Sequence, residues 1–170
     1  ALVDVNATDS FTLVGDMTST TVTVDTTNGA MALTGNITSD DATLKSGSTM
    51  NLDGILTIAD ALSLASTDAM TVTGNSSAAT VAFDSEDAMT VTGNITGSTS
   101  VQLDAVAAMS ITGNVGSALV DVNATDSFTL VGDMTGTTVT VDTTNGAMAL
   151  TGNINATDAT LKSGSTMNLD

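Results

Sequence analysis

The stretch Ala88-Met89-Thr90-Val91-Thr92-Gly93-Asn94 decides the fold, because it returns along the whole chain at a short, regular spacing. It occurs unchanged at 69–75, and weaker copies keep its Gly-Asn or Gly-Asp pair. With Gly93 as the anchor, equivalent glycines follow one another at alternating steps of 20 and 19 residues, at Gly15, Gly35, Gly54, Gly74, Gly93, Gly113, Gly132 and Gly152. A fixed period this short is typical of one structural unit stacked on itself.

A longer repeat contains the short one. Residues 1–53 recur as 118–170 with four changes, which are Ser19 to Gly136, Thr38 to Asn155, Ser39 to Ala156 and Asp40 to Thr157. The long period is therefore 117 residues, or six short repeats averaging 19.5. We predict one continuous segment over 1–170, with 1–117 as one long repeat and 118–170 as the start of the next. Because neither end departs from the pattern as a polar capping repeat would, we expect an uncapped slice of a longer tandem array.

Each short repeat has the pattern of two short strands. Apolar and polar residues alternate over 22–24 and again over 31–34, and the turn between them, 25–29, is rich in residues that favour positive φ. After Gly35 and Asn36 one more apolar residue, Ile37, is followed by what we expect to be a polar loop.

Five apolar columns appear when the nine repeats are aligned. Two columns come from the first strand, two from the second, and one from the residue equivalent to Ile37, which is broken once by Ser76. Such columns arise when successive coils wind one above another, with each strand pairing in parallel with its copy about 4.8 Å away. We therefore predict an all-β, single-chain parallel β-solenoid of about nine coils, with about 19.5 residues per coil.

Methionine opens the second strand in most repeats, at Met31, Met50, Met70, Met89, Met109, Met148 and Met167. A periodic methionine is a conceivable metal or haem ligand, but unbranched thioethers that fill a narrow core are the better interpretation.

An asparagine follows the corner glycine at Asn36, Asn75, Asn94, Asn114 and Asn153, with Asp16 and Asp133 as variants and Ile55 as the exception. Two interpretations stay open and are compatible. In the first, the side chains form an amide ladder across coils, as in other stacked strands; in the second, the residue simply tolerates left-handed φ in a turn.

The charge of the chain excludes several partners. Two basic residues stand against 19 acidic ones, for a net charge of −17. This disfavours nucleic acid and anionic membrane surfaces, both of which need Lys and Arg. No apolar run approaches the roughly 20 residues of a membrane span.

Catalytic chemistry has few candidates in a chain without His, Cys or Tyr. A serine-lysine pair is conceivable near Lys45 and near its copy Lys162, but the columns place Asp25 and Asp142 opposite these lysines. Charge pairs between neighbouring strands are the better explanation. We therefore expect no enzyme and no cofactor.

Calcium is a weaker hypothesis for the acidic residues. Asp68 and Asp87 occupy equivalent turn positions in adjacent coils, Asp84 and Asp104 lie just past the first strand, and Glu86 is nearby. Calcium needs several oxygen ligands, yet neither an EF-hand loop nor the G-G-x-G-x-D repeat is present.

Paired threonines flank the inward residue of the second strand at Thr71 and Thr73 and at Thr90 and Thr92. This arrangement resembles the flat threonine array of β-solenoid antifreeze proteins, which implies ice or ordered-surface binding. The array is short, because other repeats place Asn51 with Asp53, or Thr129 with Val131, at the same sites.

The whole pattern, rich in Thr, Val, Gly, Asn and Asp and nearly identical over long tandem units, resembles the shafts of giant bacterial cell-surface adhesins and extracellular filament proteins. A second resemblance is to the T-V-T-G-N repeats of viral tail fibres, although about 19.5 residues per coil suffice for one chain to close on itself. The first resemblance implies an extracellular or cell-surface structural role. It also implies further copies of the repeat above and below as partners, and other filaments or cell surfaces as contacts.

Overall fold

The computed structural model describes all residues from 1 to 170 and contains twenty strands and no helix. Eleven strands form the first sheet: β1 (Leu2–Ala7), β3 (Met17–Thr18), β4 (Thr21–Thr26), β6 (Ile37–Ser46), β8 (Leu56–Ser66), β10 (Ser76–Ser85), β12 (Ile95–Ala105), β14 (Val115–Gly116), β15 (Leu119–Ala124), β17 (Met134–Thr143) and β19 (Ile154–Ser163). Nine form the second: β2 (Phe11–Val14), β5 (Met31–Thr34), β7 (Met50–Asp53), β9 (Met70–Thr73), β11 (Met89–Thr92), β13 (Met109–Thr112), β16 (Phe128–Val131), β18 (Met148–Thr151) and β20 (Met167–Leu169).

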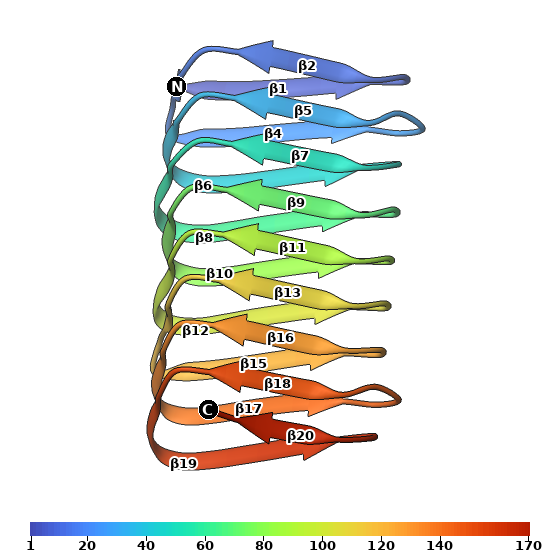
Figure 1. Ribbon diagram of the computed structural model, residues 1–170. Helices are drawn as coiled ribbons and strands as arrows, with labels where there is room; N and C mark the ends of the chain where they lie inside the picture. Colours follow the sequence, from blue (N-terminus) through green and yellow to red (C-terminus); the bar gives the residue numbers. More distant parts are fainter.

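The strands stack in parallel, each on its own copy in the next coil, and the termini lie at opposite ends of the stack (Figure 1). Met89, for example, pairs with Met70 on one side and with Met109 on the other. The prediction of an all-β parallel solenoid with about 20 residues per coil is confirmed. Residues one repeat apart become neighbours in space, which is why the sequence repeats in columns.

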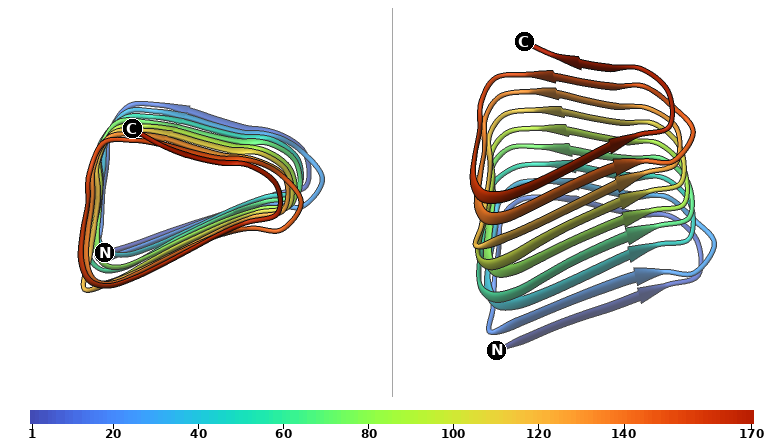
Figure 2. Two further views of the ribbon diagram at one scale, coloured as in Figure 1. Left: turned by 60° about the horizontal axis from the view of Figure 1, so that its bottom comes forward. Right: turned by 90° about the horizontal axis from the view of Figure 1, so that it is seen from below.

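Each coil has three sides, and the outline is roughly triangular when viewed close to the axis (Figure 2). We call the side made by β1, β4, β15 and the later residues of the long strands face A. The nine-stranded sheet is face B. The short third side, made by β3, β14 and the opening residues of β6, β8, β10, β12, β17 and β19, is face C.

Face C corrects the expected polar loop. The chain from Ile37 to Ser46 is a single strand that turns the corner between faces C and A, where the register with the next coil shifts between Ser39 and Asp41. Backbone amides and carbonyls need partners, and the neighbouring coil follows the same path and supplies them. Polar side chains at alternate positions therefore face solvent from a strand.

One continuous apolar core of 38 buried residues runs through the middle of the stack. Away from the end coils, the apolar residues of the five predicted columns are buried in it. Two further columns point inward and escaped prediction, because most of their residues are small or carry a hydroxyl. One lies on face C, with Ser39, Ile58 and Ala78, and the other closes face A, with Thr26, Ser46, Ser66 and Ser85.

The corner between faces B and C depends on glycine. All eight residues with positive φ are the corner glycines, with values from 117° to 157°. A Cβ on any of them from Gly35 onward would meet the carbonyl oxygen of the corner glycine one coil before. The expected positive φ in the turn at 25–29 is wrong, because Gly29 does not adopt it.

Candidate functional surface

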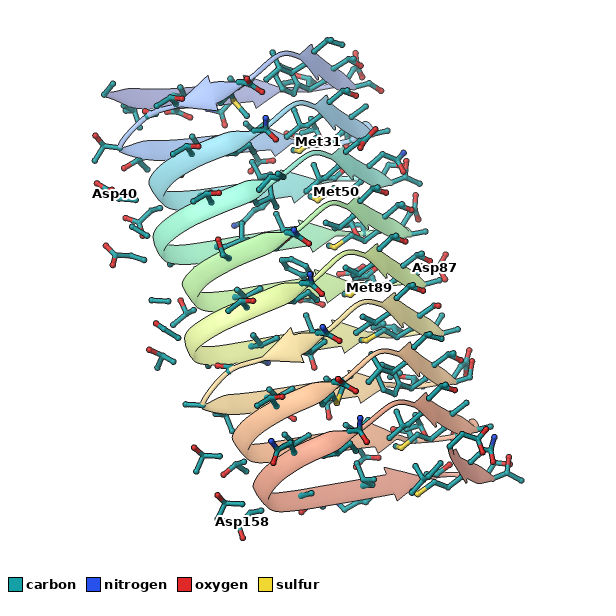
Figure 3. The ribbon with its side chains drawn as sticks, turned by 60° about the vertical axis from the view of Figure 1, so that its left-hand side comes forward. Met31, Asp40, Met50, Asp87, Met89 and Asp158 are labelled. Atoms are coloured by element: carbon teal, nitrogen blue, oxygen red, sulfur yellow. The ribbon has the colours of Figure 1, made fainter.

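The methionine row lies inside the coil, packed in the apolar core. Figure 3 shows the side chains of Met31, Met50 and Met89 directed into the interior, one coil above another. The six from Met31 to Met148 are at most 1% exposed. Met167 is 40% exposed, because it belongs to the last coil.

The asparagine row forms a ladder, but of a different kind from either interpretation. Its Oδ1 atoms accept hydrogen bonds from the backbone amide one coil further on: from Ile55 to Asn36, Asn94 to Asn75, and Asn114 to Asn94, each at 2.9 Å. Asp133 likewise donates its backbone amide to Asn114, and Asn153 donates its own to Asp133, both at 2.8 Å.

Contacts between the side chains of this ladder occur only where an aspartate takes part, from Asn36 to Asp16 and from Asn153 to Asp133, both at 3.1 Å. The left-handed alternative is wrong, since no residue other than glycine has positive φ. Ile55 interrupts the ladder, so the amide of Asn75 meets no side-chain oxygen there.

A buried hydroxyl ladder fixes the turn between faces A and B. Ser46 donates to the carbonyl of Thr49 at 2.9 Å, and Ser85 shares its one hydroxyl proton between the carbonyls of Asp68 at 3.0 Å and Ala88 at 3.2 Å. Thr26 makes the equivalent bond to Gly29 at 2.7 Å. The sequence analysis did not predict this ladder. The signal that could have shown it is the recurrence of Ser or Thr just after the first strand.

Three buried hydroxyls have no partner. They belong to Ser39, Ser76 and Ser117, and all three lie on face C. The four changes between residues 1–53 and 118–170 also fall on face C or on the corner after it. The sequence and the hydrogen bonding of face C are therefore less constrained than those of faces A and B.

The calcium candidates do not converge. Asp84 and Asp104 are paired in register, but Asp104 takes its hydrogen bonds from Gln102 at 2.8 Å and Asn123 at 2.9 Å. In the neighbouring turns Asp68 accepts from the Ser48 hydroxyl at 2.8 Å, while Asp87 lies at the outer edge of its turn (Figure 3). Glu86 is also exposed, and nowhere in the chain do three or more acidic side chains gather in a way that fits a metal ion.

The lysines lie where the columns placed them, opposite Asp25 and Asp142. Lys162 Nζ is 3.5 Å from Asp142, whereas Lys45 and Asp25 share the register without forming an ion pair. Ser48, the serine near Lys45, donates its hydroxyl proton to Asp68 at 2.8 Å.

Face B carries the threonine array. Thr71, Thr90, Ser110 and Thr129 form one row paired in register, and Thr73, Thr92 and Thr112 form a second row that ends at Val131. On the other side the rows stop at Asn51 and Asp53. Asp53 is the only charged residue within the strands of this face, so face B is a nearly neutral strip on a strongly acidic molecule.

The structure contains no helix of the length and apolarity that crossing a membrane requires. Comparisons with protein-family models, with curated proteins and with solved structures gave no match to this chain.

Proposed function

We propose that this chain is the shaft of an extracellular or cell-surface filament or adhesin, where it acts as a stiff, acidic spacer. The observation that carries the proposal is the unbroken stacking along one axis. A single core and a continuous backbone ladder run from the first coil to the last, with 130 backbone hydrogen bonds. The length of such a rod is set by the number of repeats and by little else.

Three further features support this role. Polar side chains such as those of Asn94 and Ser85 are engaged in hydrogen-bond ladders between coils. Acidic groups are spread over the molecule and give a net charge of −17, which opposes clumping of neighbouring rods. Nearly identical long repeats allow the length to change without a change of fold.

Small-angle X-ray scattering on two chain lengths tests the shaft proposal. Adding one 117-residue long repeat should lengthen the rod by six coils, or about 29 Å at about 4.8 Å per coil, without widening its cross-section. A control extended by a flexible Gly/Ser segment of equal length should instead broaden the distribution of distances. A compact particle that grows in all directions would contradict the proposal.

A second candidate function rests on face B, whose register-paired threonine rows present hydroxyls and methyls on a flat, nearly neutral surface. On this alternative the face binds ice or another ordered surface. Thermal hysteresis and ice-crystal shaping would be lost in a Thr71→Tyr, Thr90→Tyr double variant and kept in a Thr43→Tyr control on face A. A plain shaft gives no hysteresis with any of the three proteins.

A further inference from the structure

We propose that the turn between β4 and β5, and its copy between β17 and β18, are sites of spontaneous modification, at which Asn28 and Asn145 lose ammonia and become aspartate or isoaspartate. Four residues separate the strands in these two turns, whereas three do so in every other coil. Both turns are wider than the other turns between faces A and B (Figure 1). The proposal goes beyond the shaft function and does not rest on it, because it concerns the chemistry of a single turn.

Each longer turn places a glycine directly after an exposed asparagine, as Asn28-Gly29 and again 117 residues later. Packing explains why the residue is glycine. A Cβ on Gly29 would strike the backbone of Asp9 and Ser10 in the preceding turn, and a Cβ on Gly146 would meet the preceding turn in the same way. The residue after the asparagine therefore has no side chain to shield its backbone amide.

The backbone amide of Gly29 is free to react. It makes no hydrogen bond, although the amides of Thr27 and Asn28 just before it donate to the preceding turn at 2.9 and 3.0 Å. The glycine is held instead through its carbonyl, which accepts from the Thr26 hydroxyl at 2.7 Å. The amide of Gly146 is equally unbonded. Each turn thus combines an exposed side-chain amide with an adjacent backbone nitrogen that has no partner.

The asparagines of the corner ladder lack both properties. The residue after each carries a side chain, and its amide is bonded to the next coil: Ser76 donates to Asn94 and Ile95 donates to Asn114, both at 2.9 Å. The ladder side chains are also held, as where Asn75 Oδ1 accepts from the Asn94 amide at 2.9 Å. Attack by such an amide would first break a bond between coils. The fold therefore favours reaction at the two turns over reaction at the ladder.

The reaction consumes one water molecule and needs no other partner. The Gly29 nitrogen gives up its proton to hydroxide and attacks Cγ of Asn28, which forms an N–Cγ bond and closes a succinimide ring. The side-chain nitrogen takes up a proton and leaves as ammonia. Water then opens the ring. Cleavage of the new N–Cγ bond gives aspartate, whereas cleavage of the original peptide C–N bond gives isoaspartate, in which the main chain runs through Cγ.

Either product adds a carboxylate to a molecule whose net charge is already −17. The Asn28 amide is bonded to the carbonyl of Thr8, so the new charge lies next to Asp9 of the preceding turn. Asn145 is placed beside Asp126 in the same manner. Like charges on neighbouring strands destabilise a sheet. Modification therefore adds local repulsion once in every long repeat.

Peptide mapping by mass spectrometry, after incubation of the folded chain in mildly alkaline buffer, tests the proposal. Alkali accelerates the reaction because the attacking nitrogen must lose its proton. Replacement of NH₂ by OH should appear at Asn28 and Asn145 and not at ladder positions such as Asn94. Isoaspartate methyltransferase should label the same two turns, and hydroxylamine, which cleaves succinimides, should cut the chain after residues 28 and 145. Circular dichroism establishes that the chain stays folded throughout.

The matched control is the Asn28→Gln, Asn145→Gln double variant. It keeps the amide group and the charge, but its longer side chain closes a ring far more slowly, so it should gain no carboxylate and should resist hydroxylamine. A folded chain that stays unmodified at both turns would overturn the proposal. Equal rates at Asn28 and Asn94 in the folded chain would overturn it too, because the fold would then give no selectivity. Neither result touches the shaft function, which the scattering experiment tests separately.

Discussion

Ser76 and Ser85 are buried to the same degree but differ in their hydrogen bonds. Ser76 is 1% exposed within an aliphatic row, and its hydroxyl has no partner. Ser85 is 0% exposed, and its one hydroxyl proton is shared between two carbonyl oxygens. A buried hydroxyl without a partner costs about 1–3 kcal/mol, while a satisfied one contributes about 1 kcal/mol.

Two alanine substitutions should therefore shift stability in opposite directions. We expect Ser76→Ala to raise the free energy of unfolding by roughly 1 kcal/mol and Ser85→Ala to lower it by a similar amount. Urea unfolding followed by circular dichroism measures both. Equal destabilisation by the two variants would show that the Ser76 hydroxyl is in fact satisfied.

Gly93 and Gly116 differ in whether a side chain can be added. Gly93 has φ of 138°, and an added Cβ would strike the Gly74 carbonyl, whereas nothing lies within 4 Å of a Cβ on Gly116. We expect Gly93→Ala to destabilise the protein by at least about 1–3 kcal/mol from backbone strain alone. Gly116→Ala should be neutral or stabilising by about 0.4–1 kcal/mol. Similar unfolding midpoints for the two variants would contradict the geometry of the corner.

At the scale of elements, the ladder beside the corner has one missing rung. Ile55 is 48% exposed where the neighbouring coils carry Asn, so it shields little core and leaves the Asn75 amide without a side-chain acceptor. We expect Ile55→Asn to stabilise the protein by about 0.5–1.5 kcal/mol through one added hydrogen bond. Ile55→Ala, which supplies no acceptor, is the control, and thermal unfolding compares them. If both variants were more stable than the unmodified protein, the cause would instead be the removal of the exposed isoleucine.

The two strands of faces A and B were predictable because their inward positions hold large apolar residues, such as Val24 and Met31, whose alternation is plain. Face C was not, because its second inward position holds Ser39, Ile58, Ala78 and Gly97 in successive coils. A column of such varied size has no hydrophobic period. It is held in a strand by the pairing of its backbone with the next coil.

The outward surfaces were predictable in part. Register placed Asp25 opposite Lys45 and Asp142 opposite Lys162 correctly, yet only the second pair closes to 3.5 Å. Spacing fixes which residues are neighbours, whereas the rotamers of long exposed side chains decide which neighbours touch. The hydroxyl ladder was missed for another reason, since Ser46 and Ser85 look like ordinary turn residues until their burial is seen.

Across the whole molecule, a net charge of −17 on 170 residues makes repulsion a general term in stability. Asp84 and Asp104 lie directly opposite each other, where like charges destabilise a sheet. We expect the melting temperature to rise as NaCl goes from about 0.01 M to 1 M, which shortens the Debye length from about 30 Å to 3 Å. Asp84→Asn should raise the melting temperature at low salt and make it depend less on the NaCl concentration.

The control for this salt effect is CaCl₂ at matched ionic strength. Screening predicts that the melting temperature differs only modestly between the two salts. A much larger rise of the melting temperature with CaCl₂ would indicate specific calcium binding and would contradict an explanation by screening alone.

The hydrogen bonds between coils, such as that from Met50 to Ala69, join one coil to the next along the axis of the rod. A pull along this axis therefore loads the bonds of one junction at a time, and the end coil peels away before its neighbours. Each released coil of about 20 residues can extend to roughly 65–70 Å, compared with about 4.8 Å in the stack. Single-molecule stretching should show a sawtooth of small, nearly equal steps of this size rather than one large event. The stack would thus lengthen more than tenfold under load, which would limit the force that it transmits.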